Sequence, residues 1–166
     1  MPSELDKFVT NCAFSTKEKL KDALRELLGK YGDDLPAEAI EQAVSDENLG
    51  NWVTYCDSRK PDELVAGFHY EHNDWYLCTL KNAAVKTEAR GKGIGRQLYL
   101  DTASKAKADP RCLVLAADVT YDNEPSIRAL KRAGFEEVNM FCWGKGQKPA
   151  NIMHMILHPP TGTKCE

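Results

Sequence analysis

The most informative stretch of the chain reads Val85-Lys86-Thr87-Glu88-Ala89-Arg90-Gly91-Lys92-Gly93-Ile94-Gly95-Arg96. An apolar segment from Trp75 to Val85 leads into it, and a helical pattern with Leu98 and Leu100 follows it. This order predicts a strand, a tight glycine turn and the start of a helix. The first amides of a helix have no partner within the helix, and the helix dipole adds about half a positive charge there. Such a place binds phosphate groups.

The spacing of the glycines narrows the class of phosphate ligand. A dinucleotide fingerprint needs Gly-x-Gly-x-x-Gly, but the sixth position counted from Gly91 is Arg96. A nucleoside-triphosphate loop needs Gly-Lys followed by Ser or Thr, whereas Gly93 follows Lys92 here. Both readings fail, which argues against a nucleotide-binding switch. An Arg-x-x-Gly-x-Gly loop remains, or a glycine-rich connection without a ligand.

A second segment carries the signals of a short helix after a buried strand. Residues 112–119 are predicted to form the strand. Asn123 is a good helix N-cap, Pro125 suits the first turn, and Gly134 would end the helix. Ile127, Leu130 and Ala133 would form its buried stripe.

Together the two segments resemble the GNAT superfamily of N-acetyltransferases. In that superfamily an Arg-x-x-Gly-x-Gly loop holds the pyrophosphate of acetyl-coenzyme A, and Gly-Phe closes a later helix that follows an Asn. Asn123 and Gly134-Phe135 match at the expected separation, and the resemblance covers roughly residues 53–158. It weakens toward the N-terminus.

The resemblance implies one GNAT domain over residues 1–166 with an α+β fold. That fold has a mixed, mostly antiparallel sheet of about seven strands and about four helices, in the order β-α-α-β-β-β-α-β-α-β-β. Turn residues and apolar periodicity predict strands at residues 7–13, 52–56, 64–70, 75–85, 112–119, 136–143 and 151–157. The same signals predict helices from Ser15 to Gly29 or Gly32, from Pro36 to before Gly50, from the glycine loop to Asp109, and over residues 124–133.

The resemblance also implies the residues that bind the cofactor. The main chain of Ala83 and Val85, in a strand that splays from its neighbour, would pair with the amide-containing arm of coenzyme A. The loop would hold the pyrophosphate, and Asn123 would bond the arm near the thioester. The full set is Ala83, Val85, Arg90, Gly91, Lys92, Gly93, Ile94, Gly95, Arg96 and Asn123. No covalent enzyme intermediate is required, because direct transfer needs only an aligned acceptor.

Asp118 is the candidate general base. An alkyl amine has a pKa near 10.4, so a base that removes its proton helps at neutral pH. Asp118 lies five residues before Asn123, where ribosomal-protein-type N-terminal acetyltransferases carry a Glu. Its shorter side chain favours action through a water molecule, and the alternative is that it caps a strand end or pairs with a Lys. Glu71 and Asp74 are weaker candidates for the base or simply turn residues.

The general acid is less clearly indicated. Many GNAT enzymes place a Tyr four residues before the Gly of Gly-Phe, and Leu130 stands there in this chain. Tyr121 is the candidate acid in its place, with Tyr99 as a second; either could instead serve in aromatic packing, with water protonating the leaving thiolate. The change to Leu130 is also the one feature that favours a non-catalytic acyl-coenzyme A sensor with the same fold.

Composition bounds the partners. The formal net charge of −3 argues against a nucleic-acid binder driven by bulk charge, and no apolar run is long enough for a membrane span or signal peptide. Six cysteines without a Cys-x-x-Cys pair predict a reduced, cytoplasmic protein without a disulfide framework or a zinc site. The four histidines show no metal spacing on one helix, and a metal site where His69 and His72 meet around a strand turn is a weaker alternative.

The acceptor is indicated only by charge. Acidic residues gather in the N-terminal third at Asp33, Asp34, Glu38, Glu41, Asp46 and Glu47. They favour a small cationic amine over a peptide amine, although charged residues on helices are often only solvated faces. By resemblance the acceptor would lie between the first two helices and the loop 143–149. The superfamily also leaves a homodimer open.

Overall fold

The computed structural model describes residues 4–10, 12–32, 35–73, 75–142, 146 and 148–158. Its α-helices are α1 (Lys17–Tyr31), α2 (Ala37–Ala43), α3 (Asp46–Leu49), α4 (Ile94–Lys107) and α5 (Glu124–Arg132). Its strands are β1 (Phe8–Val9), β2 (Trp52–Asp57), β3 (Lys60–His72), β4 (Leu77–Val85), β5 (Val114–Thr120), β6 (Glu136–Cys142) and β7 (Pro149–Ile156). Two short 3-10 helices, η1 (Glu4–Lys7) and η2 (Thr87–Ala89), complete the elements of the described chain.

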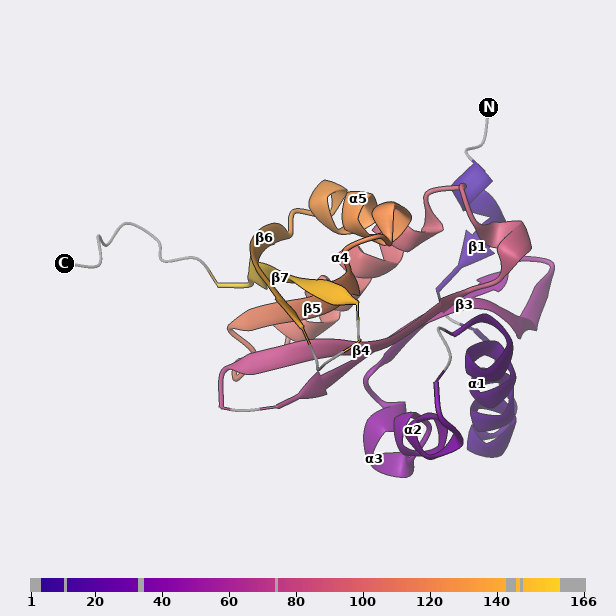
Figure 1. Cartoon of the computed structure of the whole chain (residues 1–166). Helices are drawn as coiled ribbons and strands as arrows, with labels where there is room; N and C mark the ends of the chain where they lie inside the picture. The colour runs from indigo at the N-terminus through magenta and orange to yellow at the C-terminus, as the bar shows by residue number, and fades with distance from the viewer. Residues whose placement is uncertain are drawn as a thin grey trace.

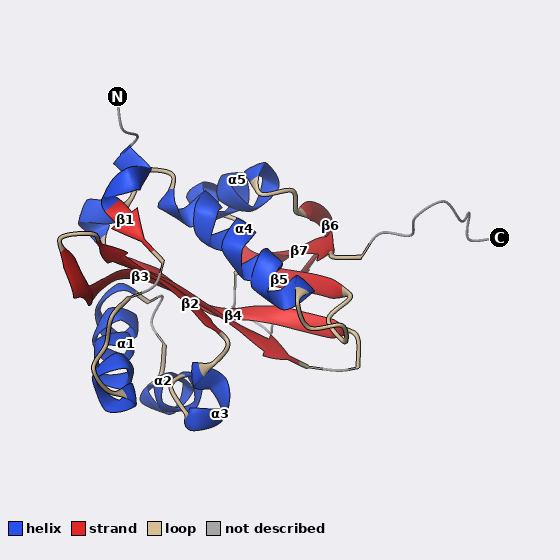
Figure 2. Ribbon diagram, turned by 180° about the vertical axis from the view of Figure 1, so that it is seen from behind, coloured by secondary structure: helices blue, strands red, loops and turns tan. Residues whose placement is uncertain are grey.

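The strands form one seven-stranded sheet in the order β1-β2-β3-β4-β5-β7-β6. All neighbours are antiparallel except β4 and β5, which are parallel because α4 crosses between them. Helices α4 and α5 cover one face of the sheet, and α1, α2 and α3 lie on the opposite face (Figures 1 and 2). The expected α+β fold with a mostly antiparallel sheet is confirmed, with five α-helices among the described residues rather than about four.

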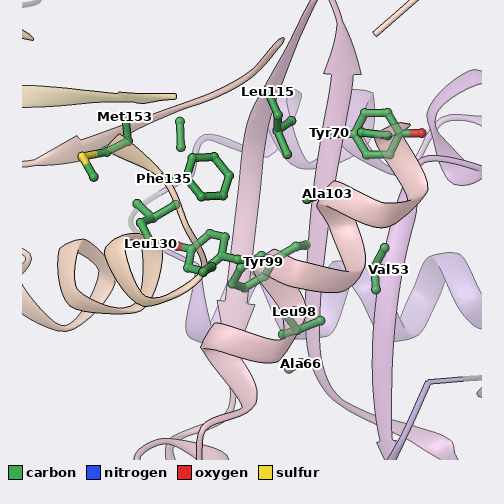
Figure 3. Close-up of a cluster of buried hydrophobic side chains, with 14 of the residues drawn as sticks. Val53, Ala66, Tyr70, Leu98, Tyr99, Ala103, Leu115, Leu130, Phe135 and Met153 are labelled. Carbon is green, nitrogen blue, oxygen red and sulfur yellow. The ribbon is translucent and has the colours of Figure 1, made fainter. Parts of the chain in front are cut away.

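The core between the sheet and α4–α5 fixes the start of α4 (Figure 3). Ile94 and Leu98 of α4 are 1% and 0% exposed, and Leu115 and Leu130 are buried in the same cluster. Tyr99 packs edge-on against Phe68, with ring centroids 4.5 Å apart. Burying one such aliphatic side chain contributes about 1.5–3 kcal/mol, so the core holds the first turn of α4 firmly.

Helix α1 covers the opposite face for reasons local to its sequence. The Thr16 side chain accepts a hydrogen bond from the Lys19 amide at 3.2 Å, and the Gly32 amide donates to Leu28 O at 2.8 Å. Leu24, with two further buried leucines, packs in a second cluster that includes Trp52 of β2. Capping and one apolar stripe thus define this helix.

The predicted ranges of the N-terminal half need correction. The first strand is short, because only Phe8 and Val9 pair with β2. The single predicted second helix is two, since Ser45 is extended and starts α3. The predicted turn at residues 60–62 is wrong: the Asp57 side chain accepts from the Arg59 amide at 2.9 Å, which places the turn at residues 58–59. From residue 75 onward the predicted strands and the helix α5 agree with the structure to within two residues at each end.

The expectation of unpaired cysteines is also wrong for four of them. Cys12 is bonded to Cys56 and Cys78 to Cys112, with Cα atoms 5.7 Å and 5.8 Å apart. Each pair joins segments that only the folded sheet brings together, so spacing in the sequence does not reveal them. The composition argument for a cytoplasmic location loses this support. No helix within the described ranges has the length and apolar character needed to cross a bilayer.

Candidate active site

Strands β4 and β5 pair over only part of their length. Leu77 to Leu80 pair with Val114 to Ala117, and the pairing ends there. The rest of β4 stays paired with β3, from Asn82 opposite His69 to Val85 opposite Ala66. Within the described sheet, the β5 side of residues 81–85 therefore faces a gap. Ala83 and Val85, predicted to bind the cofactor arm, both lie along this gap.

The glycine loop joins the end of β4 to α4. Gly91 and Gly93 have φ angles of 75° and 83°, in the left-handed region that glycine adopts most readily. Gly93 is the N-cap residue of α4, and its carbonyl accepts the hydrogen bond of the Gln97 amide at 3.1 Å. The amides of residues 94–96 precede that bond, so they have no partner within the helix.

The space in front of these amides is open. A Cβ atom added to Gly91, Gly93 or Gly95 would meet no other atom within 4 Å. Ile94 points the other way, into the core, and is 1% exposed. The loop thus presents backbone amide donors with open space around its three glycines.

The three cationic side chains of the loop each contact a neighbouring element. Arg90 Nε donates to Val85 O at 3.0 Å, and Arg96 Nε donates to Arg132 O at 3.2 Å. Lys92 Nζ lies 5.8 Å from the centroid of the Phe8 ring. A guanidinium has five N–H donors, so both arginines keep donors for an anion.

A cavity of about 180 Å³ lies at the gap between β4 and β5. Tyr99 of α4 and Leu130 of α5 line it on one side of the sheet, and Leu35, which precedes α2, lines it from the other. Asn123, the N-cap of α5, and Asp118 of β5 line the same cavity. Two ligands approaching from opposite faces of the sheet could therefore meet in it.

Asp118 is the only carboxylate among the described lining residues. The Asp118 side chain is exposed in the structure, and partial desolvation where it borders the cavity raises the pKa of its carboxyl group, while Lys81 and His154 act in the opposite direction. Its carboxylate forms no ion pair within 4 Å with any described lysine, contrary to one of the alternatives given by the sequence. A carboxylate with a raised pKa at a cavity fits a group that accepts a proton.

Tyr121, the candidate acid, does not share the cavity with Asp118. It is 50% exposed and is not among the residues that line the cavity. Tyr99 does line it and is 7% exposed, next to the buried Leu130. Of the weaker base candidates, Glu71 pairs with Thr79 on β4 away from the cavity, and Asp74 lies outside the described residues.

Several cavity residues escaped prediction. Leu35, Lys81, Asn82 and Ser126 line it although no motif singled them out. Asn82 carried no clear signal in the sequence, because it follows the polar residue Lys81 and only the residues after it, Ala83 to Val85, are apolar.

The acidic residues of the N-terminal third are less available to bind a cationic acceptor than the sequence suggested. Arg25 pairs with Glu41 at 2.8 Å and Lys21 with Asp46 at 2.9 Å, and both carboxyl groups have lowered pKa values as a result. Asp33 and Asp34 lie outside the described residues, as does most of the loop 143–149.

A family model described as the acetyltransferase (GNAT) family matches residues 17–135. The chain belongs to this family. The match includes the glycine loop, the gap and Asp118, and it ends at Phe135 as the motif did. Members of the GNAT family transfer an acetyl group from acetyl-coenzyme A to nitrogen, so the protein is an N-acetyltransferase.

Solved GNAT structures share its architecture. Ard1 from Thermoplasma volcanium superposes with a TM-score of 0.72 at 16% identity, over 90% of this chain and 97% of that one. NAA60 from Arabidopsis thaliana in complex with acetyl-CoA gives 0.64 at 17% identity, over 90% and 98%. Spermidine N-acetyltransferase from Vibrio cholerae in complex with CoA and spermine gives 0.65 at 11% identity, over 92% and 96%. No curated protein sequence matches the chain. At these identities the likeness shows the fold.

The residues present fit coenzyme A. The open backbone surface of the glycine loop offers amides to a diphosphate, and the side of β4 that faces the gap offers main-chain groups to an amide-containing arm, although Val85 O already accepts a hydrogen bond from Arg90. Among the described side chains, no group of three His, Cys, Asp or Glu could hold a metal ion.

Proposed function

We propose that this protein transfers the acetyl group of acetyl-coenzyme A to a small cationic primary amine by direct attack within a ternary complex. The observation that carries the proposal is the cavity at the strand gap. Asn123, Tyr99, Asp118 and Leu35 all line it, and we assign the first two to the cofactor side and the last two to the acceptor side.

In the proposed geometry the loop amides of residues 91–96 bind the diphosphate, and the β4 main chain at Ala83 and Val85 orients the arm. Asn123, whose side chain also accepts from the Ser126 amide at 3.3 Å, lies where the arm would reach the cavity. Fixing the thioester in this way aligns it with an amine that enters from the other face.

Asp118 takes the proton that the ammonium must lose before its nitrogen can attack. The raised pKa of Asp118 brings the carboxyl group closer to neutral pH, which makes proton uptake easier than for a solvated Asp. Lys81, which also lines the cavity, repels a second positive charge there, so the amine is favoured in its neutral form. Because no described lining residue is a cysteine, direct transfer is favoured over an acyl-cysteine intermediate.

The test is release of coenzyme A thiol from acetyl-coenzyme A with a panel of a polyamine, an aminoglycoside, simple alkylamines and short peptides with free N-termini. Direct attack predicts intersecting double-reciprocal lines when both substrates vary, whereas a covalent intermediate predicts parallel lines. If only the peptides were acetylated, the acceptor would be a peptide amine and the proposal of a small amine would be wrong.

One observation favours a second candidate, a non-catalytic acyl-coenzyme A sensor. Leu130 lines the cavity and is 1% exposed, so an apolar side chain stands where many GNAT enzymes carry an acid. Tight binding of coenzyme A with no thiol release from any amine would support the sensor.

A further inference from the structure

A buried pair of polar side chains lies directly behind the acceptor side of the cavity. His69 of β3 is 0% exposed, and its Nδ1 is 3.3 Å from Nδ2 of Asn82 on β4. Asn82 is 9% exposed and lines the cavity at the strand gap. The His69 ring stacks on Trp52 with centroids 5.1 Å apart, and the Trp52 indole donates to Ala43 O at 2.8 Å. The pair is thus held in one orientation from behind.

In the orientation that the structure records, Nδ2 of Asn82 faces His69, and the side-chain oxygen of Asn82 is left for a ligand. Burial lowers the pKa of His69 to about 4, so its imidazole is neutral at physiological pH. With Nδ2 of Asn82 as donor, Nδ1 of His69 accepts and Nε2 carries the proton. The side-chain oxygen of Asn82 then has no hydrogen-bond partner within the described chain.

The arrangement is unfavourable for the fold alone. His69 Nε2 is buried without a hydrogen-bond partner in the described structure. An unpaired buried donor destabilises a protein by about 1–3 kcal/mol. A polar pair maintained against that penalty at the wall of a reaction cavity needs an explanation, and groups of this kind occur at functional sites.

We propose that Asn82 selects a primary amine as the acceptor, because its side-chain oxygen accepts a hydrogen bond from one N–H group of the amine, and that His69 is a positioning residue that orients the Asn82 amide. This inference rests on the proposed function. Asn82 lies on β4 and Asp118 on β5, so the two side chains border the gap from its two strands.

The proton inventory explains why a primary amine is needed. The ammonium gives its first proton to Asp118, from which it passes to solvent. The nitrogen lone pair then forms the C–N bond to the thioester carbon, the C–S bond breaks, and its electron pair leaves with the sulfur. The nitrogen's second proton ends on that sulfur as the thiol forms. The third N–H, which becomes the amide N–H, is the one that Asn82 holds throughout. A secondary amine has no third proton, so it cannot make this bond while it reacts.

The experiment compares butylamine with N-methylbutylamine as acceptors in the thiol-release assay, for wild type, Asn82→Ala, His69→Phe and the double variant. His69→Phe keeps a ring against Trp52 and removes Nδ1. Asn139→Ala, on exposed β6 and outside the described cavity lining, is the matched control. The dissociation constant of coenzyme A, measured by calorimetry, verifies that each variant is folded and binds the cofactor.

The wild type is expected to prefer butylamine at least tenfold in kcat/KM. Asn82→Ala should lower kcat/KM for butylamine by about tenfold, or about 1.4 kcal/mol, leave N-methylbutylamine unchanged, and leave cofactor affinity unchanged. His69→Phe should lose less, and the double variant should lose no more than Asn82→Ala, because both changes act on one bond.

An unchanged ratio of the two amines in Asn82→Ala overturns the inference while the acetyltransferase proposal stands. A rise for N-methylbutylamine with butylamine unchanged also overturns it, because Asn82 would then exclude the methyl group by size. A wild type that binds coenzyme A but releases no thiol with any amine overturns the proposed function instead, and this inference with it.

Discussion

Gly95→Glu separates the role of the glycine loop in binding from its role in folding. Gly95 lies in the first turn of α4, and a Cβ atom there would meet no other atom within 4 Å. Replacing a helical glycine gains up to about 1 kcal/mol in helix propensity, and an acidic side chain in the first turn adds about 0.3–1 kcal/mol. The free energy of unfolding of the protein without ligand should therefore stay the same or rise.

The effect on coenzyme A should have the opposite sign. The new carboxylate would extend into the open space before the loop amides, and we take a separation of about 5 Å from a bound diphosphate charge as the working value for Coulomb's law. Two like charges at that distance repel by roughly 3 kcal/mol at an effective dielectric constant of about 20, and by roughly 1 kcal/mol in water. Because the loop is exposed, the expected loss of affinity lies between these limits, about 5-fold to 150-fold.

Calorimetric titration of coenzyme A into the purified variant, with thermal unfolding measured without ligand, tests both signs. Gly29→Glu is the matched control, since Gly29 lies in α1 and also has no atom within 4 Å of an added Cβ. Gly93→Glu should also lose binding, but its φ of 83° adds backbone strain and makes that result harder to interpret. A folded Gly95→Glu protein with wild-type affinity for coenzyme A would refute the assignment of the loop.

Three further predictions concern single side chains. Asp118→Asn should lower kcat at least about tenfold without changing coenzyme A affinity, because the amide cannot accept the proton of the ammonium. Tyr121→Phe should keep kcat within about twofold, because the ring is half exposed and outside the described cavity lining, and a tenfold loss would reinstate it as the acid. Burial lowers the pKa of His69 to about 4 in the native state. At mildly acidic pH the imidazole is therefore protonated in the unfolded chain but still neutral in the native state. The free energy of unfolding should therefore fall by up to roughly 3 kcal/mol between about pH 6.5 and pH 4, and His69→Phe should lack this component in urea titrations.

The sequence predicted the parts of the site whose determinants are adjacent in the chain. Gly93 and Ile94 define the start of α4 by backbone freedom and burial, and Asn123 with Pro125 defines the start of α5. These are local effects of capping and turn chemistry, which a short stretch of sequence contains in full. The predicted strands and helix α5 after residue 75 agree with the structure for the same reason.

Residues that depend on strand pairing could not be predicted in this way. The role that we propose for Asn82 depends on β3, which places His69 opposite it, and on β5, which no longer pairs with β4 at that level. The pairs Cys12–Cys56 and Cys78–Cys112 are likewise products of the assembled sheet. Leu35 reaches the cavity from a segment that precedes α2 and carries no motif. In each case the partner is distant in sequence, and register rather than composition decides the contact.

The separation of β4 from β5 links the features of the site. The described pairing between them ends at Leu80 and Ala117, and the next residues of each strand, Lys81 and Asp118, line the cavity. Main-chain groups left without a ladder partner are unfavourable unless water or a ligand satisfies them. The same gap that would accept the arm of coenzyme A also opens a passage through the sheet, which a continuous ladder would close. In the proposed function, cofactor binding and acceptor access therefore both depend on this gap, and a ligand that paired with β4 would stabilise the site in which the amine would react.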